Sequence, residues 1–491
     1  MQQVPPSAGT HRYVILVIVL VGVLMSVLDG IVVSIALPTI TGAFSVDLSA
    51  SQWIITAYML TLTSLLLFFG RVAEFTGRSV LFILGLAVFT LASLACGLSA
   101  TLAQLIAFRV AQGIGGAMVF SISGAILFLA FPPQERGRAM GYLGSTVAIG
   151  SILGPILGGF LVDTLGWRAI FLINLPIGVI LVAFSLLFLR TREERKPVFH
   201  MDWIGAATLV AALFFLMLLL SRLARVSESP LAAVLCAVLF VAAAAAFIVR
   251  ESRYERPLLD LGIFRSRAFL MPVLAMMLFF VSSFMINVVG PFYFEEVMGF
   301  RPTQVGLMFL VVPVVMVVAS PVAGWLYDTR RWRHYGAAGI AAVSLCYIAL
   351  GILAQSWYSV AAMGGIFVIL GLGSALFQSP NSTEVMNSLP PGQTAIASSV
   401  SAAVRNLGMT LGVALASLFL PLQLRMFGSA GGVLQAGKGP LAASVGNIMI
   451  ASGVLCILAV VVLARNRGTA VAGAGSTAIV SGEAPAGPGT P

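Results

Sequence analysis

The sequence predicts an all-α, polytopic membrane protein with 14 transmembrane helices, and three observations support this fold class. The 491 residues are 59% hydrophobic and only 9% charged, whereas soluble domains carry about 25% charged residues. Apolar runs of the roughly 20 residues that a bilayer-spanning helix needs recur along the whole chain. The Lys and Arg residues, which give a net charge of +10, lie between these runs and not along one face. We therefore expect lipid, and not nucleic acid, around this protein.

Fourteen apolar runs are bounded by charged, Pro-containing or Gly-rich breaks. They lie near residues 13–37, 52–70, 79–98, 102–130, 139–163, 168–189, 203–220, 231–249, 268–290, 303–326, 336–354, 358–378, 395–420 and 441–464. An even number of spans places both termini on one side of the membrane. If that side is the cytoplasm, most of the 27 Lys and Arg residues fall in cytoplasmic loops, as the positive-inside rule requires.

Two stretches at matching positions of the first and last six spans indicate an internal repeat. "GRVAEFTGRSVLF" (70–82) and "GWLYDTRRWRHYG" (324–336) each place an acid four residues after a glycine and arginines after the acid. Such repetition is typical of transporters built from two related bundles. The predicted organisation is a cytoplasmic N-terminus at 1–12, a six-helix bundle at 13–190, a cytoplasmic linker and inserted two-helix hairpin at 191–260, a second six-helix bundle at 261–467 and a disordered cytoplasmic tail at 468–491. The uncharged hairpin is expected to face lipid on the outside of the bundles.

Several classes of function lack the residues that they need. No phosphate-binding G-x-x-x-x-G-K-[ST] motif is present, so ATP-driven pumping by this chain alone is not expected. The histidines, His11, His200 and His334, stand singly at span edges without metal-ligand spacing. We therefore predict no enzyme activity, no metal site and no cofactor.

Two ionisable residues lie deep within apolar runs, where each costs about 2.5–3.5 kcal/mol unless it meets a partner or water. At about 1.5 Å per residue, Asp29 lies roughly 12 Å below the outer end of the first span, and Arg109 roughly 10 Å below the outer end of the fourth. At one depth, they could form a pair in which the pKa of Asp29 depends on Arg109 or on solvent. We predict a proton-coupling site; a static pair that holds two helices together is the alternative.

A third intramembrane charge, Arg405, is followed by Asn406 and has no acid at similar depth in the last six spans. It is either satisfied by carbonyls or water, or it contacts substrate. Together with Asn174 and Gln112, these two residues are the predicted substrate cavity. Because so few acids lie within the spans, a neutral or monocationic substrate is expected over a dication.

Small residues in the fifth span predict a hinge, and those in the loop after the second span predict a cytoplasmic gate. The fifth span permits close helix packing and bending through five residues, and these predicted hinge residues are Gly150, Gly154, Pro155, Gly158 and Gly159. The predicted cytoplasmic gate consists of Gly70, Glu74, Gly77 and Arg78, in which Glu74 and Arg78 pair with one another or with a helix dipole. At the outer mouth, Glu295 and Glu296 are interpreted as solvated, with cation attraction as the alternative.

Four motifs in order resemble those of the major facilitator superfamily, specifically its fourteen-helix drug:proton antiporter branch. They are "LDGIVVSIALP" (28–38), "GRVAEFTGRS" (70–79), "RVAQGIGGA" (109–117) and "GSILGPILGG" (150–159), and "WRAIFLINLPIG" (167–178) is similar too. The resemblance covers residues 13–467 and implies a multi-pass inner-membrane exporter driven by the proton gradient. Glu74 stands where the loop motif has Asp, which keeps the charge and lengthens its reach.

The leading hypothesis is therefore a secondary transporter, expected to be a monomer, that exchanges protons for amphipathic small molecules by alternating access. A lipid or metabolite exporter of the same fold is an open alternative, because an apolar interior with sparse charge suits it equally. A membrane sensor that does not transport is a third hypothesis, which the retained Asp29 disfavours.

Overall fold

The computed structural model describes residues 9–46, 48–189, 202–223, 230–254, 261–330, 334–356, 360–427 and 437–464. These ranges contain helices and no strand, and 14 of the helices are long and apolar enough to cross a membrane. The predicted fold class and number of spans are confirmed. Residues 1–8, 190–201 and 465–491 lie outside the described residues. The predictions of a cytoplasmic N-terminus, a cytoplasmic linker and a disordered tail fall on these segments.

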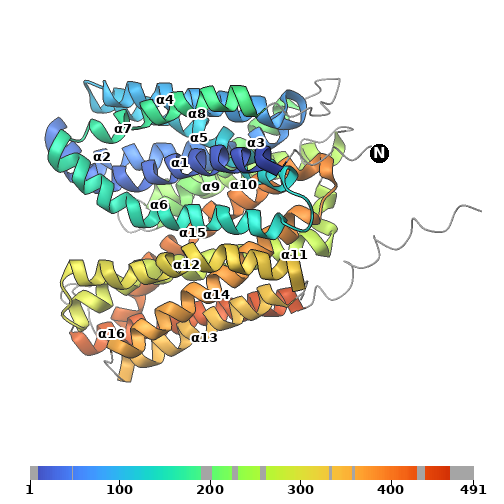
Figure 1. The fold of residues 1–491 in the computed structure, drawn as a ribbon. Helices are drawn as coiled ribbons and strands as arrows, with labels where there is room; N and C mark the ends of the chain where they lie inside the picture. The colour runs from blue at the N-terminus through green and yellow to red at the C-terminus, as the bar shows by residue number, and fades with distance from the viewer. Residues whose placement is uncertain are drawn as a thin grey trace, which may run out of the picture.

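The first six spans run side by side in one half of the molecule (Figure 1). They are α1 (Gly9–Phe44), α3 (Trp53–Thr76), α4 (Arg78–Gly97), α5 (Leu102–Ala130), α6 (Arg136–Leu165) and α8 (Asn174–Phe188), with the single turns α2 (Leu48–Ser51) and α7 (Ala169–Leu172) between them. The first span continues through Pro38 beyond its predicted end at Leu37. Its last turns stay helical because they are packed: Ile40 is fully buried in a cluster with Ile54 and Trp167.

The rest of the chain forms the inserted hairpin and the last six spans. The elements are α9 (Trp203–Leu223), α10 (Pro230–Arg253), η1 (Leu261–Arg265), α11 (Arg267–Phe292), η2 (Tyr293–Val297), α12 (Pro302–Arg330), α13 (Tyr335–Ser356), α14 (Val360–Asn387), η3 (Pro391–Gln393), α15 (Thr394–Met426) and α16 (Lys438–Ala464). Helices α11 to α16 surround a second large apolar cluster. The two halves meet where α6 packs on α12 and α14, and where α15 packs on α3 and α5.

The glycines that the sequence repeats at matching positions make the same kind of contact in both halves. In α6, Gly150 and Gly154 face Val27 and Ile31 of α1, whereas in α15 Gly408 and Gly412 face residues 277–284 of α11. A side chain at any of these glycines would collide with the neighbouring helix, so small residues four apart permit the close approach. This shared packing supports the division into two bundles that the sequence predicts.

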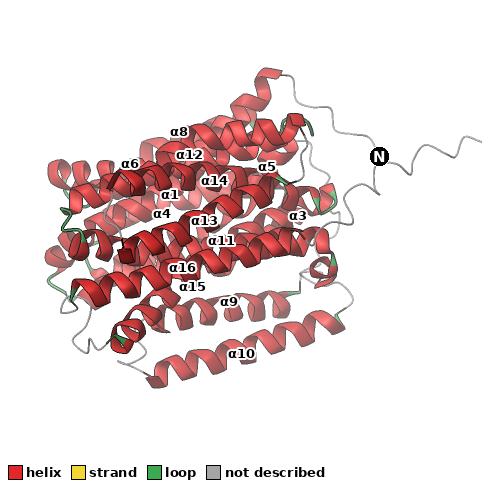
Figure 2. Ribbon diagram, turned by 90° about the horizontal axis from the view of Figure 1, so that it is seen from below, coloured by secondary structure: helices red, strands yellow, loops and turns green. Residues whose placement is uncertain are grey.

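The inserted hairpin differs from the prediction in one respect. Helix α10 faces outward as expected and packs mainly on α9, at the edge of the molecule in Figure 2. Helix α9, however, packs on both α3 and α15, through a row of buried side chains that includes Ala206, Leu209, Leu213 and Met217. Because α3 and α15 belong to different halves, α9 covers one of the two seams between the halves. The apolar composition of the hairpin alone does not predict this position.

Asp202 joins the two helices of the hairpin. Its carboxylate accepts hydrogen bonds from the backbone N–H groups of Ile204 and Gly205, at 3.1 and 3.0 Å, and from Arg250 Nε of α10 at 2.9 Å. Burial acts to raise the pKa of Asp202, but these hydrogen bonds outweigh it and hold the pKa below its ordinary value. The carboxylate therefore stabilises the hairpin at neutral pH and loses that contribution as the pH falls through its lowered pKa.

We predict that Arg250→Gln lowers the melting temperature of the purified protein, because one ion pair with a partly exposed arginine is lost. Arg253→Gln is the matched control in the same helical turn, since Arg253 is exposed and lies outside this bond. The difference between the two variants should shrink below about pH 3.9, where Asp202 begins to protonate in the unfolded chain. Equal melting temperatures at neutral pH would contradict the role of the pair.

Candidate functional site

Arg109 lies in α5, and the start of that helix fixes its depth. Thr101 caps α5 by accepting a hydrogen bond from the N–H of Gln104 at 3.2 Å, so the helix begins at Leu102 and Arg109 follows two turns later. Gly113 and Gly116 lie against Tyr58 and its neighbours in α3. Because these glycines allow α3 to come close, the Arg109 side chain is enclosed between helices and fully buried.

Asp29 and Arg109 form a buried ion pair. Arg109 Nη1 donates to Asp29 Oδ2 at 2.5 Å, with both side chains shielded from solvent. Arg109 Nε donates to the carbonyl oxygen of Ile54 at 3.0 Å, and its guanidinium carbon lies 4.2 Å from the centroid of the Tyr58 ring. The arrangement holds α1, α3 and α5 together, and removing either charge would leave the other buried without its partner, typically at a cost of about 3–5 kcal/mol.

Two amides complete the surroundings of Asp29 Oδ1. Gln112 Nε2 donates to it at 2.8 Å, and Asn174 Nδ2, from the first turn of α8, lies at 3.4 Å. Gln112 also accepts from Arg109 Nη1 at 2.7 Å and donates to Ser93 Oγ of α4 at 2.7 Å. The carboxylate therefore faces donors from two helices, α5 and α8. The only buried nitrogen of the pair without a hydrogen-bond partner among the described residues is Arg109 Nη2.

The structure divides the four residues predicted for a substrate cavity. Gln112 and Asn174 bind Asp29 in the first half, whereas Arg405 and Asn406 lie in α15, where the Arg405 guanidinium stands 5.6 Å from the Phe280 ring centroid. Sequence reasoning missed the contributions of Ser93 and Tyr58. A polar residue in an apolar span was the only signal for Ser93, and none indicated which face of α3 would carry Tyr58.

The predicted hinge glycines of α6 lie against α1 beside Asp29. Gly150 faces Val27, Gly154 faces Ile31, and Gly158 faces Val32 and Ile35, so three of the four contact the turns on either side of the acid. Gly159 points into open space, and Pro155 is exposed on the same outer surface while the helix continues through it. Movement of α6 relative to α1 would therefore act directly on the turns that carry Asp29.

The predicted gate residues form a tight corner between α3 and α4, at the face of the bundle where α1 begins. Gly70 approaches Ser399 of α15 so closely that any side chain would collide with it, and Gly77 turns the chain with φ of 91°, a conformation that favours glycine. Glu74 is buried and pairs with Arg71 at 2.6 Å. The sequence interpretation has Glu74 and Arg78 pair with one another or with a helix dipole; the structure adds Arg71, three residues before Glu74 on the same helix face, as an ion-pair partner of Glu74.

The repeated stretch of the second half makes a corresponding contact across the other seam. Gly324 of α12 lies directly against the backbone of Gly137 in α6. Asp328 accepts hydrogen bonds from the N–H groups of Gly137 and Arg138, both at 2.9 Å. A carboxylate at the first turn of a helix is stabilised by unpaired N–H groups and by the helix dipole. Asp328 thus closes the start of α6 onto the second half.

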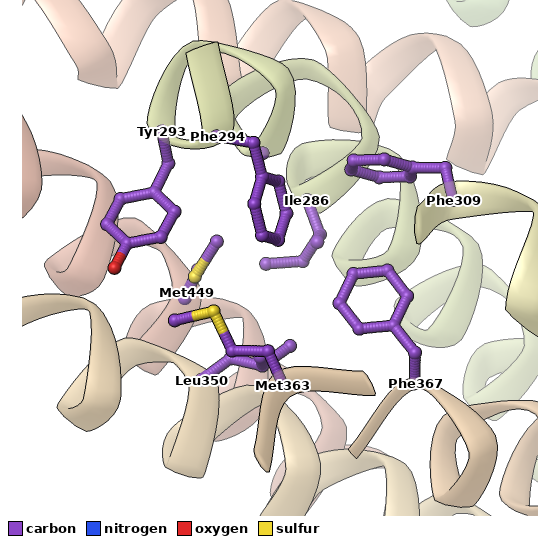
Figure 3. A pocket seen from close by; sticks show the side chains of 9 residues that line it. Ile286, Tyr293, Phe294, Phe309, Leu350, Met363, Phe367 and Met449 are labelled. Atoms are coloured by element: carbon purple, nitrogen blue, oxygen red, sulfur yellow. The ribbon is translucent and has the colours of Figure 1, made fainter. Parts of the chain in front are cut away.

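A narrow apolar pocket lies near the opposite face, within the second half (Figure 3). Phe294 and Phe309 point toward Phe367, at centroid distances of 6.1 and 5.5 Å, and Met363 and Met449 close the side below them. Edge-to-face rings of this kind stabilise helix packing. In the neighbouring turn of η2 both Glu295 and Glu296 are exposed, as the solvated interpretation predicted.

These features define a polytopic helical membrane protein with an ionisable site buried between its spans; the described residues contain no cluster that could hold a metal ion. The sequence model of the Major Facilitator Superfamily matches residues 19–413, and the chain belongs to that family. It is accordingly a transporter and not an enzyme.

Curated relatives and solved structures agree with this assignment. The riboflavin transporter RibZ of Clostridioides difficile is 31% identical over 84% of this chain and 89% of its own length. The multidrug export protein EmrB of Escherichia coli K12 is 31% identical over 84% and 81%, and the multidrug resistance protein Stp of Mycobacterium tuberculosis is 30% identical over 80% and 73%. The multidrug relatives confirm the resemblance to the fourteen-helix branch.

The fold is shared with more distant transporters. The human organic anion transporter MFSD10 superposes with a TM-score of 0.62 at 19% identity, over 91% of this chain and 99% of its own. The proton:xylose symporter XylE gives 0.61 at 13% identity, over 93% and 96%. At these identities the likeness concerns the fold alone.

We predict that Gly324→Ala opens the seam between α6 and α12, because the added methyl group cannot coexist with the Gly137 backbone. Single cysteines placed near Gly137 should then react faster with a water-soluble maleimide. Gly306→Ala is the matched control in α12, where an added methyl group meets open space. Unchanged labelling in the Gly324 variant would show that this contact does not close the seam.

Proposed function

We propose that the protein is a secondary active transporter that exports amphipathic small molecules in exchange for protons, by alternating access. The observation that carries this proposal is the fully buried pair of Asp29 and Arg109 with Gln112 bridging the two side chains. When this carboxylate takes up a proton, the positive charge of Arg109 loses its counter-charge, so protonation favours a rearrangement around the pair. Because the guanidinium keeps the Ile54 carbonyl and the Tyr58 ring as partners, it retains contacts when Asp29 is neutral.

Protonation would change the force between α1 and α5. With Asp29 ionised, the short contact to Arg109 attracts the two helices; with Asp29 neutral, the Coulombic part of that attraction is lost. Gln112 supports both states, because its Nε2 can donate to a neutral or a charged carboxyl oxygen. A proton on Asp29 therefore favours a looser arrangement of α1, which is the requirement for coupling protonation to conformation.

Helix α6 offers a mechanical link from this site to the seam. Its outer half carries Gly150 and Gly154 against α1, and its first turn is bound by Asp328 of α12. A helix fixed at both places transmits a shift of α1 to the contact between the two halves. Rocking of one bundle against the other around a fixed site is the usual form of alternating access.

The amphipathic substrate class is supported by the apolar interior and by the names of the relatives, which include multidrug exporters. A metabolite exporter is the second candidate, because another relative is named as a riboflavin transporter. In both proposals the protein acts as a monomer, is driven by the proton gradient without a cofactor, and lies in the cell inner membrane with both termini in the cytoplasm, as the distribution of Lys and Arg favours.

We predict that Asp29→Asn abolishes substrate-dependent proton movement, because an amide cannot bind and release the coupled proton. Everted vesicles with an imposed pH gradient and a pH-sensitive dye measure this. Asp163→Asn, at an exposed acid near the end of α6, is the control and should behave like the unmodified protein. Proton movement at the normal rate in the Asp29 variant would refute the coupling role, and its melting temperature would show that it is folded.

We predict that Gly154→Ala slows transport at least severalfold, because the methyl carbon would lie 2.6 Å from Ile31 Cγ2 and push α6 away from α1. Gly159→Ala is the matched control: it sits in the same motif, but no atom lies near the added methyl group. Uptake into everted vesicles of a fluorescent amphipathic dye that the unmodified protein transports compares the two variants. Equal transport rates in the two variants would show that the packing of α6 on α1 plays no part in transport.

A further inference from the structure

Arg405 is an arginine within the membrane-spanning part of α15 that has no counter-charge among the residues that the structure describes. Its Nε is buried and has no hydrogen-bond partner among the described residues, and its contact there is with the ring of Phe280, at 5.6 Å from the centroid. Arg109, the other arginine deep in a span, has a carboxylate, a carbonyl and an amide around it. The positive charge of Arg109 is therefore compensated by a carboxylate, whereas that of Arg405 is not compensated by any described residue.

No acid of the described residues is available to Arg405. Asp29 is held by Arg109, Gln112 and Asn174 in the first half. Every other Asp or Glu in the described ranges lies in the last turn of a helix, in a loop or in η2. Counting the buried pair as neutral, the described parts of the spans carry one uncompensated positive charge deep in the hydrocarbon region, whose cost an anion could offset.

The position of Arg405 suits a transported ligand. It follows Thr394, the first residue of α15, by three helical turns, or roughly 16 Å at 1.5 Å per residue, near the middle of a hydrocarbon core about 30 Å thick. On one side, Gly408 packs on α11; on the other, Ser398 and Ser399 face Gly124 of α5 and Gly70 of α3. Arg405 thus stands on the helix that joins the second half to the first, and its side chain is partly accessible.

We propose that Arg405 binds the anionic group of the substrate, so that the preferred substrates are amphipathic anions or zwitterions bearing a carboxylate, sulfonate or phosphate. This inference rests on the proposed transport function and names its substrate class. It replaces the neutral or monocationic substrate that the count of acids favours. The planar guanidinium can present two parallel N–H groups to such an oxyanion.

The test is equilibrium binding of three probes with one apolar body: 1-naphthaleneacetate, 1-naphthaleneacetamide and 1-naphthaleneethylamine, which are anionic, neutral and cationic at pH 7. The purified full-length protein is placed in nanodiscs of zwitterionic lipid, and binding to empty nanodiscs is subtracted. We expect the acetate to bind at least tenfold more tightly than the amide and the amine. Equal affinities for the three probes would overturn the proposal.

Variants assign the preference to the side chain. Arg405→Gln should weaken acetate binding at least tenfold and leave amide binding unchanged, which also shows that the variant is folded; Arg405→Lys should keep part of the preference as a point charge. Arg425→Gln, at an exposed position of the same helix, should bind all three probes normally. A preference for the acetate that survives in Arg405→Gln would assign the anion to another group and overturn the proposal.

The same assay separates this inference from the proton-coupling proposal. Asp29→Asn should retain the acetate preference, because the measurement involves binding and no proton flux. If proton coupling fails and the preference persists, the substrate class stands without the antiport mechanism. If coupling is intact and the preference is absent, Arg405 is satisfied by water or carbonyls, and the substrate class proposed here is wrong.

Discussion

The cost of placing charge in an apolar interior is the constraint on which the arrangement of this transporter depends. Asp29 and Arg109 meet it by direct contact. Asp29 Oδ1 takes Gln112 as a further partner, and Arg109 Nε takes the Ile54 carbonyl. Hydrogen bonds in such a medium are strong when complete and costly when broken. One ion pair therefore fixes the relative positions of α1, α3 and α5 and makes them sensitive to a single proton.

Close backbone packing transmits that sensitivity. Helices that are apolar on all sides gain little from facing one another or lipid, so small residues decide where they approach. Gly154 places α6 against the turn of α1 that follows Asp29, and Gly137 places the first turn of the same helix against Gly324. One helix thus touches both the ionisable site and the seam between the halves. Because both contacts are made at glycines, no flexible side chain lies between the helices to absorb a displacement of α6.

Depth along a span could be calculated from the sequence, and orientation around its axis could not. The rise per residue placed Asp29 and Arg109 at one level, and their pairing follows from it. Tyr58 over the guanidinium and Ser93 behind Gln112 depend on the rotation of α3 and α4, and a helix that is hydrophobic all round carries no pattern that fixes its rotation. The same lack of pattern concealed that α9 covers the seam between α3 and α15.

The two halves share their helix packing and differ in their charges, and this difference suggests a division of labour. Gly150 and Gly154 contact α1 as Gly408 and Gly412 contact α11, yet the residues of α11 between these contacts, from Phe280 to Phe284, include no acid that could correspond to Asp29. In the described part of the same half no carboxylate lies beside Arg405. The first half therefore holds a neutral buried pair and the second half a lone cation, within the same helix framework. A proton that binds to Asp29 leaves Arg109 without its counter-charge, so protonation is tied to a rearrangement of the helices around the pair, whereas a lone guanidinium is best satisfied by a group that arrives with the ligand.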